Sequence, residues 1–417
     1  MSIALDDRLK ERLVEQLSDV LKEAVVIGGS IVSLSSLQGV REIKSLPGRG
    51  PIADRLQRYI GDSPFSDFVL GESMVMLRSE TYDHGASEKP LTSHDGYADT
   101  IAVAKNLVEA FCSLPWSYQV AIRAPDALRN AISRDAGSFE LSPRHRLIMG
   151  STLAGSHPLR DLSRYGLAHW MTNPPISSGW DEDAVYLQVD VDGYYTAWPT
   201  EPSLIAREEI FSFFGLGIAL GLFTRAYAGV LGSSPRDTSL YVHMFRAGSW
   251  HEHRTEYLDD NHKNGIGALA VSEDIHTDPA RIRQKLDRIS SVYRAASGKN
   301  ILLSSRWLLD SHCGRDELLS YVQAAVSIEI LLGDEEADHS VGLTTLMANR
   351  CAYLIANSPE SRVSLLRDFR EIYKVRSKIV HRGKSRLSES EVRLFHVLQA
   401  IIRAVIDKEQ RLLFREV

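Results

Sequence analysis

Apolar residues recur at every fourth position near the start of the chain and predict an amphipathic helix that ends near Glu23. The residues that form this stripe are Leu5, Leu9, Leu13, Leu17 and Leu21. Short apolar, β-branched stretches follow at 25–27 and 31–34 and predict strands. Residues 47–89 are rich in Gly, Pro and Ser, so we expect mostly loops there.

A β-hairpin is predicted between residues 185 and 198. Apolar and polar side chains alternate from Val185 to Val191, the Asp192-Gly193 pair is typical of a tight turn, and an aromatic stretch runs on to Trp198. Leu240 to Phe245 predicts a further strand. The N-terminal region, residues 1–282, is therefore predicted to be α+β.

From Pro279 onward the apolar positions follow helical spacing, with short polar turns between the predicted helices. The last helix begins at a capping box, Ser388-Glu-Ser-Glu391. The predicted helices cover residues 281–296, 300–309, 316–332, 344–355, about 359–380, and a final stretch from 388. Residues 283–417 are therefore predicted to form an all-α helical bundle.

The length of 417 residues exceeds what one hydrophobic core usually serves, which favours two or three domains. We place the main boundary between residues 282 and 283. The linker-like composition of Gly232-Ser-Ser-Pro-Arg-Asp indicates a second break near 232–239, which would divide the N-terminal region into two subdomains.

One strongly apolar stretch runs from Ile210 to Phe223. Its 14 residues are fewer than the roughly 20 that a bilayer requires. Its glycines at 215, 217 and 221 imitate a dinucleotide fingerprint, but neither the leading strand nor the acidic ribose ligand is present. We therefore predict a buried helix that packs closely through its small residues, and no contact with a membrane.

Cysteine usage and the first residues indicate the cytoplasm. The three cysteines are far apart and lack metal-ligand spacing, which suits a reducing compartment. The chain begins Met-Ser-Ile-Ala-Leu-Asp-Asp, without the basic and apolar regions of a secretory signal.

Positive charge is concentrated near the end of the chain. Residues 362–386 contain nine Lys or Arg and two acids, a net charge of +7, so the rest of the chain carries −13 within the total of −6. This asymmetry predicts that a polyanion is contacted at one place.

Arg376 and His381 are the residues of this basic segment with the chemistry for phosphate transfer. Histidine side chains ionise near neutral pH and exchange protons, while a guanidinium can hold a phosphate. A helix macrodipole favours both residues in a last turn without any catalysis, so a structural role stays open. On a regular helix they lie about 140° apart, and they converge only if the helix ends or kinks between them. Gly383 is a natural C-cap just beyond them.

The run Tyr373-x-x-Arg-Ser-Lys-Ile-Val-His381 resembles the Arg-x4-6-His signature of HEPN domains, and most closely the Apea-like HEPN family associated with abortive phage infection. The upstream patterns 324–332 and 346–354 are similar to those of the family in order and spacing. The resemblance covers about residues 283–417. For residues 1–282 we identify no family.

The resemblance implies a cytoplasmic, toxic endoribonuclease that acts in antiviral defence without a metal or cofactor. Two copies, in a homodimer or a higher even-numbered oligomer, would place their motifs across a cleft and cut RNA, with tRNA among the candidates, by attack of the 2′-hydroxyl. His381 would be the acid/base and Arg376 the phosphate clamp. The N-terminal region would act as a sensor or restraint that responds to a phage-derived trigger.

Two departures from the family pattern keep an alternative open. Ser377 stands where many of these nucleases have Asn, Asp or His, and Arg382 replaces a frequent Gly. Because non-catalytic HEPN domains exist, the alternative is an RNA-binding or dimerisation module.

Further residues are expected to support this site. Glu329 lies on the apolar stripe of its helix and needs a partner if it is buried, for which Arg350 or Arg376 is available. The family carries an acid at this position. Phosphate contacts that do not depend on sequence are expected from Lys374, Lys378, Arg382, Lys384 and Arg386.

A second alternative is a metal-dependent hydrolase that uses His251 and His253, whose side chains would share one face of a strand. His243, Asp259, Asp260 and His262 lie nearby in the sequence. No clear strand context surrounds Trp250 and no acid stands at a familiar spacing, so we favour no metal site.

Overall fold

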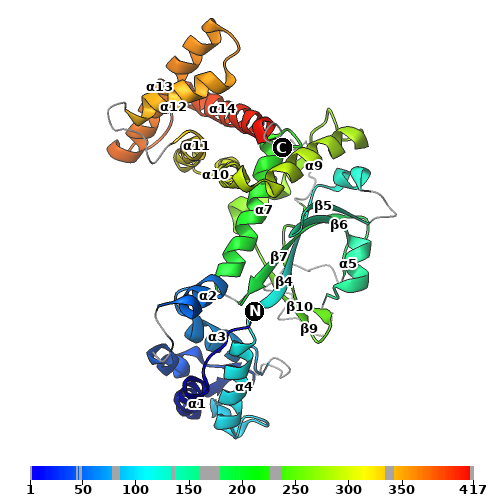
Figure 1. Cartoon of the computed structure of the whole chain (residues 1–417), viewed down its shortest axis with the longest axis vertical. Helices are drawn as coiled ribbons and strands as arrows, with labels where there is room; N and C mark the ends of the chain where they lie inside the picture. Colours follow the sequence, from blue (N-terminus) through cyan, green and yellow to red (C-terminus); the bar gives the residue numbers. More distant parts are fainter. Residues whose placement is uncertain are drawn as a thin grey trace. The chain divides into compact units, whose positions relative to one another are not determined.

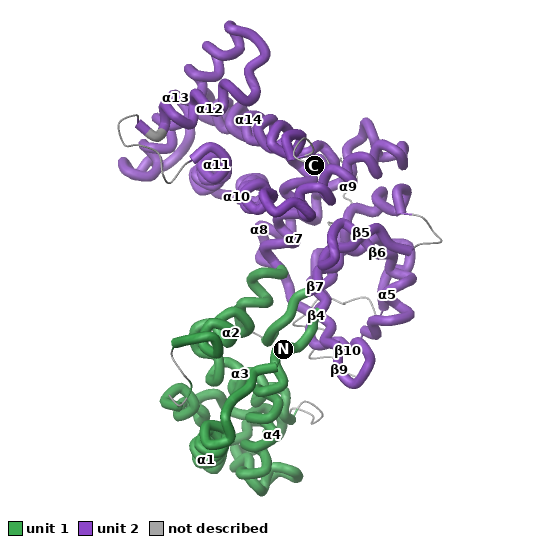
Figure 2. Tube along the Cα trace, in the orientation of Figure 1, with its two compact units in different colours: residues 1–118, 191–206 green, residues 119–190, 207–417 purple. Residues whose placement is uncertain are grey.

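The structure is a computed structural model, and it describes residues 2–43, 46, 49–77, 85–132, 137–159, 179–196, 198–225, 236–333 and 342–413. The chain divides into two compact units (Figure 2). Unit 1 comprises Met1–Tyr118 and Val191–Ala206, and unit 2 comprises Gln119–Asp190 and Arg207–Val417. The predicted boundary at 282/283 lies inside unit 2. Part of the predicted break at 232–239 lies outside the described residues.

Unit 1 begins with the predicted amphipathic helix, α1 (Asp7–Lys22), which the Asp6 side chain caps. Leu13, Leu17 and Leu21 are fully buried, so the stripe faces the core as predicted. A small antiparallel sheet has the strand order β2-β1-β3. The other elements are β1 (Val25–Ile27), β2 (Ile31–Val32), η1 (Leu34–Glu42), β3 (Lys89–Pro90), η2 (Leu91–Ser93) and α4 (Thr100–Cys112).

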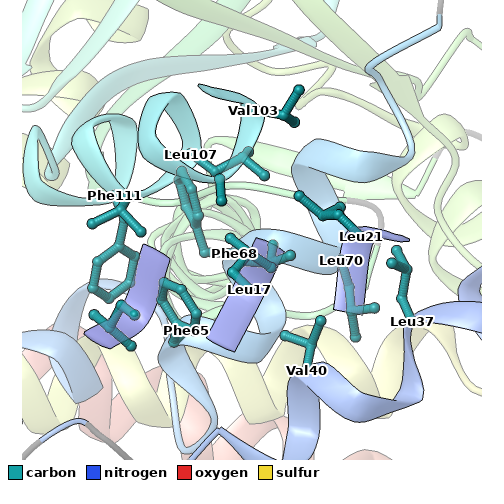
Figure 3. Close-up of a cluster of buried hydrophobic side chains, with 14 of the residues drawn as sticks. Leu17, Leu21, Leu37, Val40, Phe65, Phe68, Leu70, Val103, Leu107 and Phe111 are labelled. Carbon is teal, nitrogen blue, oxygen red and sulfur yellow. The ribbon is translucent and has the colours of Figure 1, made fainter. Parts of the chain in front are cut away.

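The prediction of loops between residues 47 and 89 was wrong for much of that segment, which contains α2 (Pro51–Tyr59) and α3 (Pro64–Ser73). Both prolines stand at the start of a helix, where the missing N–H removes no hydrogen bond and the fixed φ favours helix. Phe65, Phe68 and Leu70 of α3 enter the core of unit 1, where they meet residues of α1, η1 and α4 (Figure 3).

Unit 2 contains a six-stranded sheet with the order β10-β9-β4-β7-β6-β5. The neighbouring strands β9 and β10, β5 and β6, and β6 and β7 pair in antiparallel fashion. The predicted strand at 240–245 is confirmed as β9. The strands are β4 (Trp116–Arg123), β5 (Ser138–Ser142), β6 (His145–Met149), β7 (Val185–Gly193), β9 (Leu240–Arg246) and β10 (Ser249–Glu256).

The predicted hairpin was wrong in its second half. The first strand is β7, but both of its edges are occupied, by β4 and β6. Residues 194–196 are not a strand, and Tyr194 enters the core of unit 1, where its hydroxyl lies 3.0 Å from Glu72 Oε1. The turn signal is local, whereas the strands that pair with β7 come from elsewhere in the sequence.

The apolar stretch at 210–223 lies largely in α7 (Glu201–Ala219) and is buried, as predicted. A Cβ atom at Gly215 would overlap the carbonyl oxygen of Ser305, and one at Gly217 would overlap the Phe223 ring. No helix among the described residues is long and apolar enough to span a membrane.

The C-terminal region is helical, as predicted, and α14 contacts each of the other helices from α9 to α13 (Figure 1). The N-terminal region is α+β, so the predicted fold class holds at this level. Short elements, η3 (Asp126–Ala131), α5 (Gly150–Ser156), β8 (Phe223–Arg225), α8 (Asp260–Gly267), β11 (Leu269–Val271) and η5 (Ala296–Gly298), complete unit 2. The long helices are α9 (Pro279–Arg294), α10 (Lys299–Cys313), α11 (Glu317–Leu332), α12 (Leu343–Ile355), α13 (Pro359–Arg382) and α14 (Glu389–Leu413).

Candidate nucleic-acid interface

Helix α13 carries most of the predicted site, and its sequence defines both of its ends. Ser358 caps the first turn in a capping box with Ser361, and Pro359 occupies the first helical position. Gly383 ends the helix in the left-handed region, with φ of 60°, which confirms the predicted C-cap. Phe369, Ile372 and Val375 form its buried side.

Arg376 and His381 point in different directions within one chain. The helix continues without interruption to Arg382, so the two residues lie about 140° apart around its axis. Arg376 lies on the side that faces α11, while His381 is exposed. The single chain therefore does not bring the predicted acid/base and the predicted phosphate clamp together.

Glu329 of α11 binds Arg376, one of its two predicted partners. The Arg376 Nε atom lies 3.4 Å from Glu329 Oε1, and both side chains are about one-quarter exposed. Burial and then the neighbouring Glu329 carboxylate raise the pKa of Tyr373, whose hydroxyl also hydrogen-bonds Glu329. Arg350 donates from Nη1 to the Leu332 carbonyl oxygen, at 3.1 Å. The Glu329–Arg376 pair thus connects α11 to α13, as a structural role would require.

A pocket of about 450 Å³ lies against the other side of α13. Four cations at strict four-residue spacing, Arg370, Lys374, Lys378 and Arg382, border it together with Thr344, Tyr373 and Ser377. Residues at this spacing share one side of a helix. His381 lies three residues after Lys378 and four after Ser377, so it belongs to the same side.

The cations of this pocket differ in how far they are already neutralised. Lys374 forms an ion pair with Glu371 at 2.6 Å. Arg370, Lys378 and Arg382 make no ion pair with any residue that the structure describes. Three positive charges are therefore available to an anion on one side of α13.

The predicted phosphate contacts after the helix separate into two kinds. Lys384 is only about one-quarter exposed and lies 3.0 Å from Glu391 Oε2. Glu391 also accepts from the Ser388 N–H at 2.8 Å, which confirms the predicted capping box of α14. Lys384 therefore belongs to the α13–α14 connection. Arg386 is exposed and unpaired among the described residues.

The histidines considered for a metal site are dispersed. No group of three or more potential ligands occurs in the described parts of the chain. Trp250 does lie in a strand, β10, contrary to the sequence interpretation. However, the register shifts between Glu252 and Arg254, so His253 occupies a bulge and the alternation between His251 and His253 is interrupted.

The other candidates of that stretch have partners of their own. His251 Nε2 lies 3.2 Å from the Arg246 carbonyl oxygen, and His243 Nε2 lies 3.1 Å from that of Pro158. Asp259 caps α8 and contacts His262, while Asp260 begins that helix.

Sequence reasoning did not identify Arg370 or Thr344 as parts of the site, and it included Tyr373 only as the first residue of the motif. The sequence does contain a signal for this row of cations, because every fourth residue is basic at Arg370, Lys374, Lys378 and Arg382. The contribution of Thr344 depends on how α12 packs against α13, which no local pattern specifies.

The resemblance to HEPN domains therefore depends on the motif and on the helical character of the region that surrounds it. The structure adds the exposed row of cations on α13. No protein-family profile matches the chain, and neither the curated proteins nor the solved structures include one that is significantly similar to it.

Proposed function

We propose that the C-terminal helical region binds RNA along the exposed side of α13. The observation that carries this proposal is the row Arg370, Lys374, Lys378 and Arg382 around one pocket. Successive members are about 6 Å apart along the helix axis, so the row is about 18 Å long and can follow several phosphates of one strand. RNA is chosen over other polyanions because of the motif's resemblance to HEPN domains.

Salt dependence tests the binding directly. A fluorescein-labelled single-stranded RNA is titrated with the full chain at several NaCl concentrations, and anisotropy is measured. The double variant Lys378→Gln, Arg382→Gln should bind more weakly. The negative slope of log K against log salt should become shallower by about 1.4, which is about 0.7 for each lost phosphate contact.

A matched control removes two charges elsewhere in the same region. Arg393 and Lys408 are exposed on α14 and make no ion pair among the described residues. The Arg393→Gln, Lys408→Gln variant should keep the native slope. If both double variants lose the same slope, the binding is general electrostatic attraction and α13 is not the interface.

A second proposal is that the bound RNA is cut without a metal, and the exposure of His381 on the cationic side of α13 favours it. The 2′-oxygen would attack phosphorus while a histidine takes its proton. The bond from phosphorus to the 5′-oxygen would break, and a proton would be delivered to that oxygen. The products would be a 2′,3′-cyclic phosphate and a 5′-hydroxyl. Cations beside the ring would stabilise the added negative charge on the phosphoryl oxygens.

Cleavage of an RNA pool in EDTA tests this second proposal. His381→Ala should abolish cleavage, while His396→Ala, which removes an exposed histidine of α14, should not. Because His381 is exposed, the thermal stability of its variant should be unchanged. Cleavage by His381→Ala at the native rate would exclude the catalytic role. If the native protein binds RNA but does not cut it, the cleavage proposal is wrong and only the binding proposal stands.

Mixing two inactive variants tests whether the clamp comes from another copy. If His381 of one chain and Arg376 of a second chain form one site, Arg376→Ala and His381→Ala proteins should recover activity when they are unfolded and refolded together. A mixed dimer would then contain one complete site. No recovery, with both variants folded, would show that Arg376 acts by holding Glu329 in its own chain.

The defence role follows only if RNA is cut. We infer from the resemblance that such cleavage would act against phage infection, with the N-terminal region as restraint. Cells that express the native chain should survive or limit infection better than cells that express His381→Ala. Equal plaque numbers in both would contradict a defence role that depends on cleavage.

A further inference from the structure

Two hollows in unit 1 share Arg41 and Asp67 on their walls. The larger has a volume of about 820 Å³ and lies between the end of η1, α2 and the start of α3. The smaller has a volume of about 510 Å³ and is bordered by Leu34, Leu70 and Trp198. Val40, Phe65 and Leu70, which line these hollows, also belong to the hydrophobic core drawn in Figure 3. The hollows thus have a well-packed wall.

The two shared side chains carry opposite charges and act on each other electrostatically, but they form no ion pair with each other, and Arg41 is exposed to solvent. Neither the Arg41 guanidinium nor the Asp67 carboxylate forms a hydrogen bond or an ion pair with a residue that the structure describes. Asp67 is partly buried, and burial raises the pKa of its carboxyl above the ordinary value, with Arg41 acting in the opposite direction. Elsewhere in the described chain a buried carboxylate such as Glu256 is paired, with Arg207 and Arg254.

We propose that these hollows form a binding site for a small zwitterion of the amino-acid type. The carboxylate of the ligand would accept from the forked donors of Arg41, and its ammonium group would donate to Asp67. An apolar side chain would occupy the smaller hollow, against Leu70 and Trp198.

Other classes of ligand satisfy the walls less completely. A simple anion would leave Asp67 unpaired and would be repelled by it and by Asp62, which also lines the larger hollow. A simple cation would contact Asp67 but would make no use of the Arg41 guanidinium. A molecule with both charges close together can bind both groups at once, and the apolar wall of the smaller hollow favours one with a hydrophobic side chain.

This site is separate from the proposed RNA interface, because every residue that it uses lies in unit 1. Its test needs no RNA, so it can fail while the RNA proposal stands, and the reverse is also true. A ligand-binding N-terminal unit would give the chain a means to respond to a small molecule.

Isothermal titration of the full chain with L-phenylalanine and two analogues tests the proposal. 3-Phenylpropionate lacks the ammonium group, and 2-phenylethylamine lacks the carboxylate. Each analogue should bind about tenfold or more weakly than L-phenylalanine, because each leaves one charged side chain without its partner.

Variants identify which residue recognises which group. Asp67→Asn should weaken the binding of L-phenylalanine by about tenfold. This variant should then bind L-phenylalanine no more tightly than 3-phenylpropionate. Arg41→Gln should weaken the binding of L-phenylalanine to a similar extent. This variant should then bind L-phenylalanine no more tightly than 2-phenylethylamine. Asp54→Asn and Arg58→Gln change the charge of α2 in the same way but line neither hollow, so they should bind as the native chain does.

Two results would overturn the proposal. One is that neither L-phenylalanine nor L-leucine binds the native chain at millimolar concentration. The other is that binding occurs but Asp67→Asn and Arg41→Gln, with melting temperatures like the native one, still distinguish L-phenylalanine from both analogues.

Discussion

His262 is held between two carboxylates in unit 2. Its Nδ1 lies 2.6 Å from Asp259 Oδ2 and its Nε2 lies 2.9 Å from Asp310 Oδ1, while the ring stacks on Phe211. Burial lowers the pKa of the ring, but the two aspartates outweigh burial and raise it above the ordinary 6.5. The folded chain therefore holds this proton more tightly than the unfolded chain does.

This difference predicts how stability changes with pH. The contribution of His262 is fully present below about pH 6.5 and is lost as the pH rises through the higher pKa of the folded state. His262→Gln should lower the free energy of unfolding at pH 6 by about 2 kcal/mol and should have a smaller effect at pH 9. Urea titrations at both pH values measure this. His396→Gln is the control, and an equal loss at both pH values would show that only the ring packing matters.

At this scale the sequence predicted one pairing well and another not at all. Glu329 required a partner because it lies on an apolar stripe, and only a few arginines were near enough in the pattern to supply one. Asp310, in contrast, is separated from His262 by 48 residues and lies on another helix. No spacing rule connects them, because their contact depends on how α8 meets α10.

Helix α7 approaches α10 so closely that a side chain is excluded at Gly215. A Cβ atom there would overlap the Ser305 carbonyl oxygen, which is backbone and cannot rotate away. Gly215→Ala should therefore lower the free energy of unfolding by about 2–3 kcal/mol, despite the better helix propensity of alanine. Thermal or urea unfolding of the full chain measures this loss.

Gly155 supplies the matched control for this prediction. It lies in the short helix α5, and a Cβ atom there would meet nothing within 4 Å. Gly155→Ala should be neutral or stabilising by up to about 1 kcal/mol. If Gly215→Ala behaves in the same way, α7 and α10 are not packed as tightly as described.

Periodicity predicted the elements whose apolar side faces one neighbour, such as α1 and α13. It failed where distant partners decide the outcome. β7 has the alternation of a hairpin strand, yet β4 and β6 occupy its edges. β10 contains His251, Glu252 and His253 and lacks an apolar side, so it was not recognised as a strand. Backbone pairing with β9 holds it in place.

Across the whole chain, the charge of the basic segment overstates what a polyanion could contact. Arg376, Lys374 and Lys384 are already paired with Glu329, Glu371 and Glu391. The unpaired cations that border the pocket on the exposed side of α13 are therefore fewer than the nine Lys and Arg of the basic segment. The sequence shows the basic segment and Glu371 within it, but only the packing of α11 and α14 shows that Arg376 and Lys384 are already paired.

Helix α9 connects the helical region to the sheet within unit 2. The Tyr293 hydroxyl donates to the Glu209 carbonyl oxygen at 2.9 Å, and its ring lies 4.4 Å from that of His145 in β6. On the same helix Ser290 donates to the Leu141 carbonyl oxygen at 2.7 Å, and Arg288 binds Asp407 of α14 at 2.7 Å. A domain boundary at 282/283 would cut through α9 and would separate most of that helix from the strands that it contacts.

These contacts predict that the sheet and the helices of unit 2 unfold together. Tyr293→Ala removes the hydrogen bond and the ring contact and should lower the free energy of unfolding by about 3 kcal/mol. Amide hydrogen exchange in mild urea should then become faster in β5, β6, α10 and α11. The factor should be about the same in all four elements, because one cooperative unit opens as a whole. If only the strands lose protection while α10 and α11 keep theirs, the helical region is a separate folding unit and the boundary at 282/283 is physical.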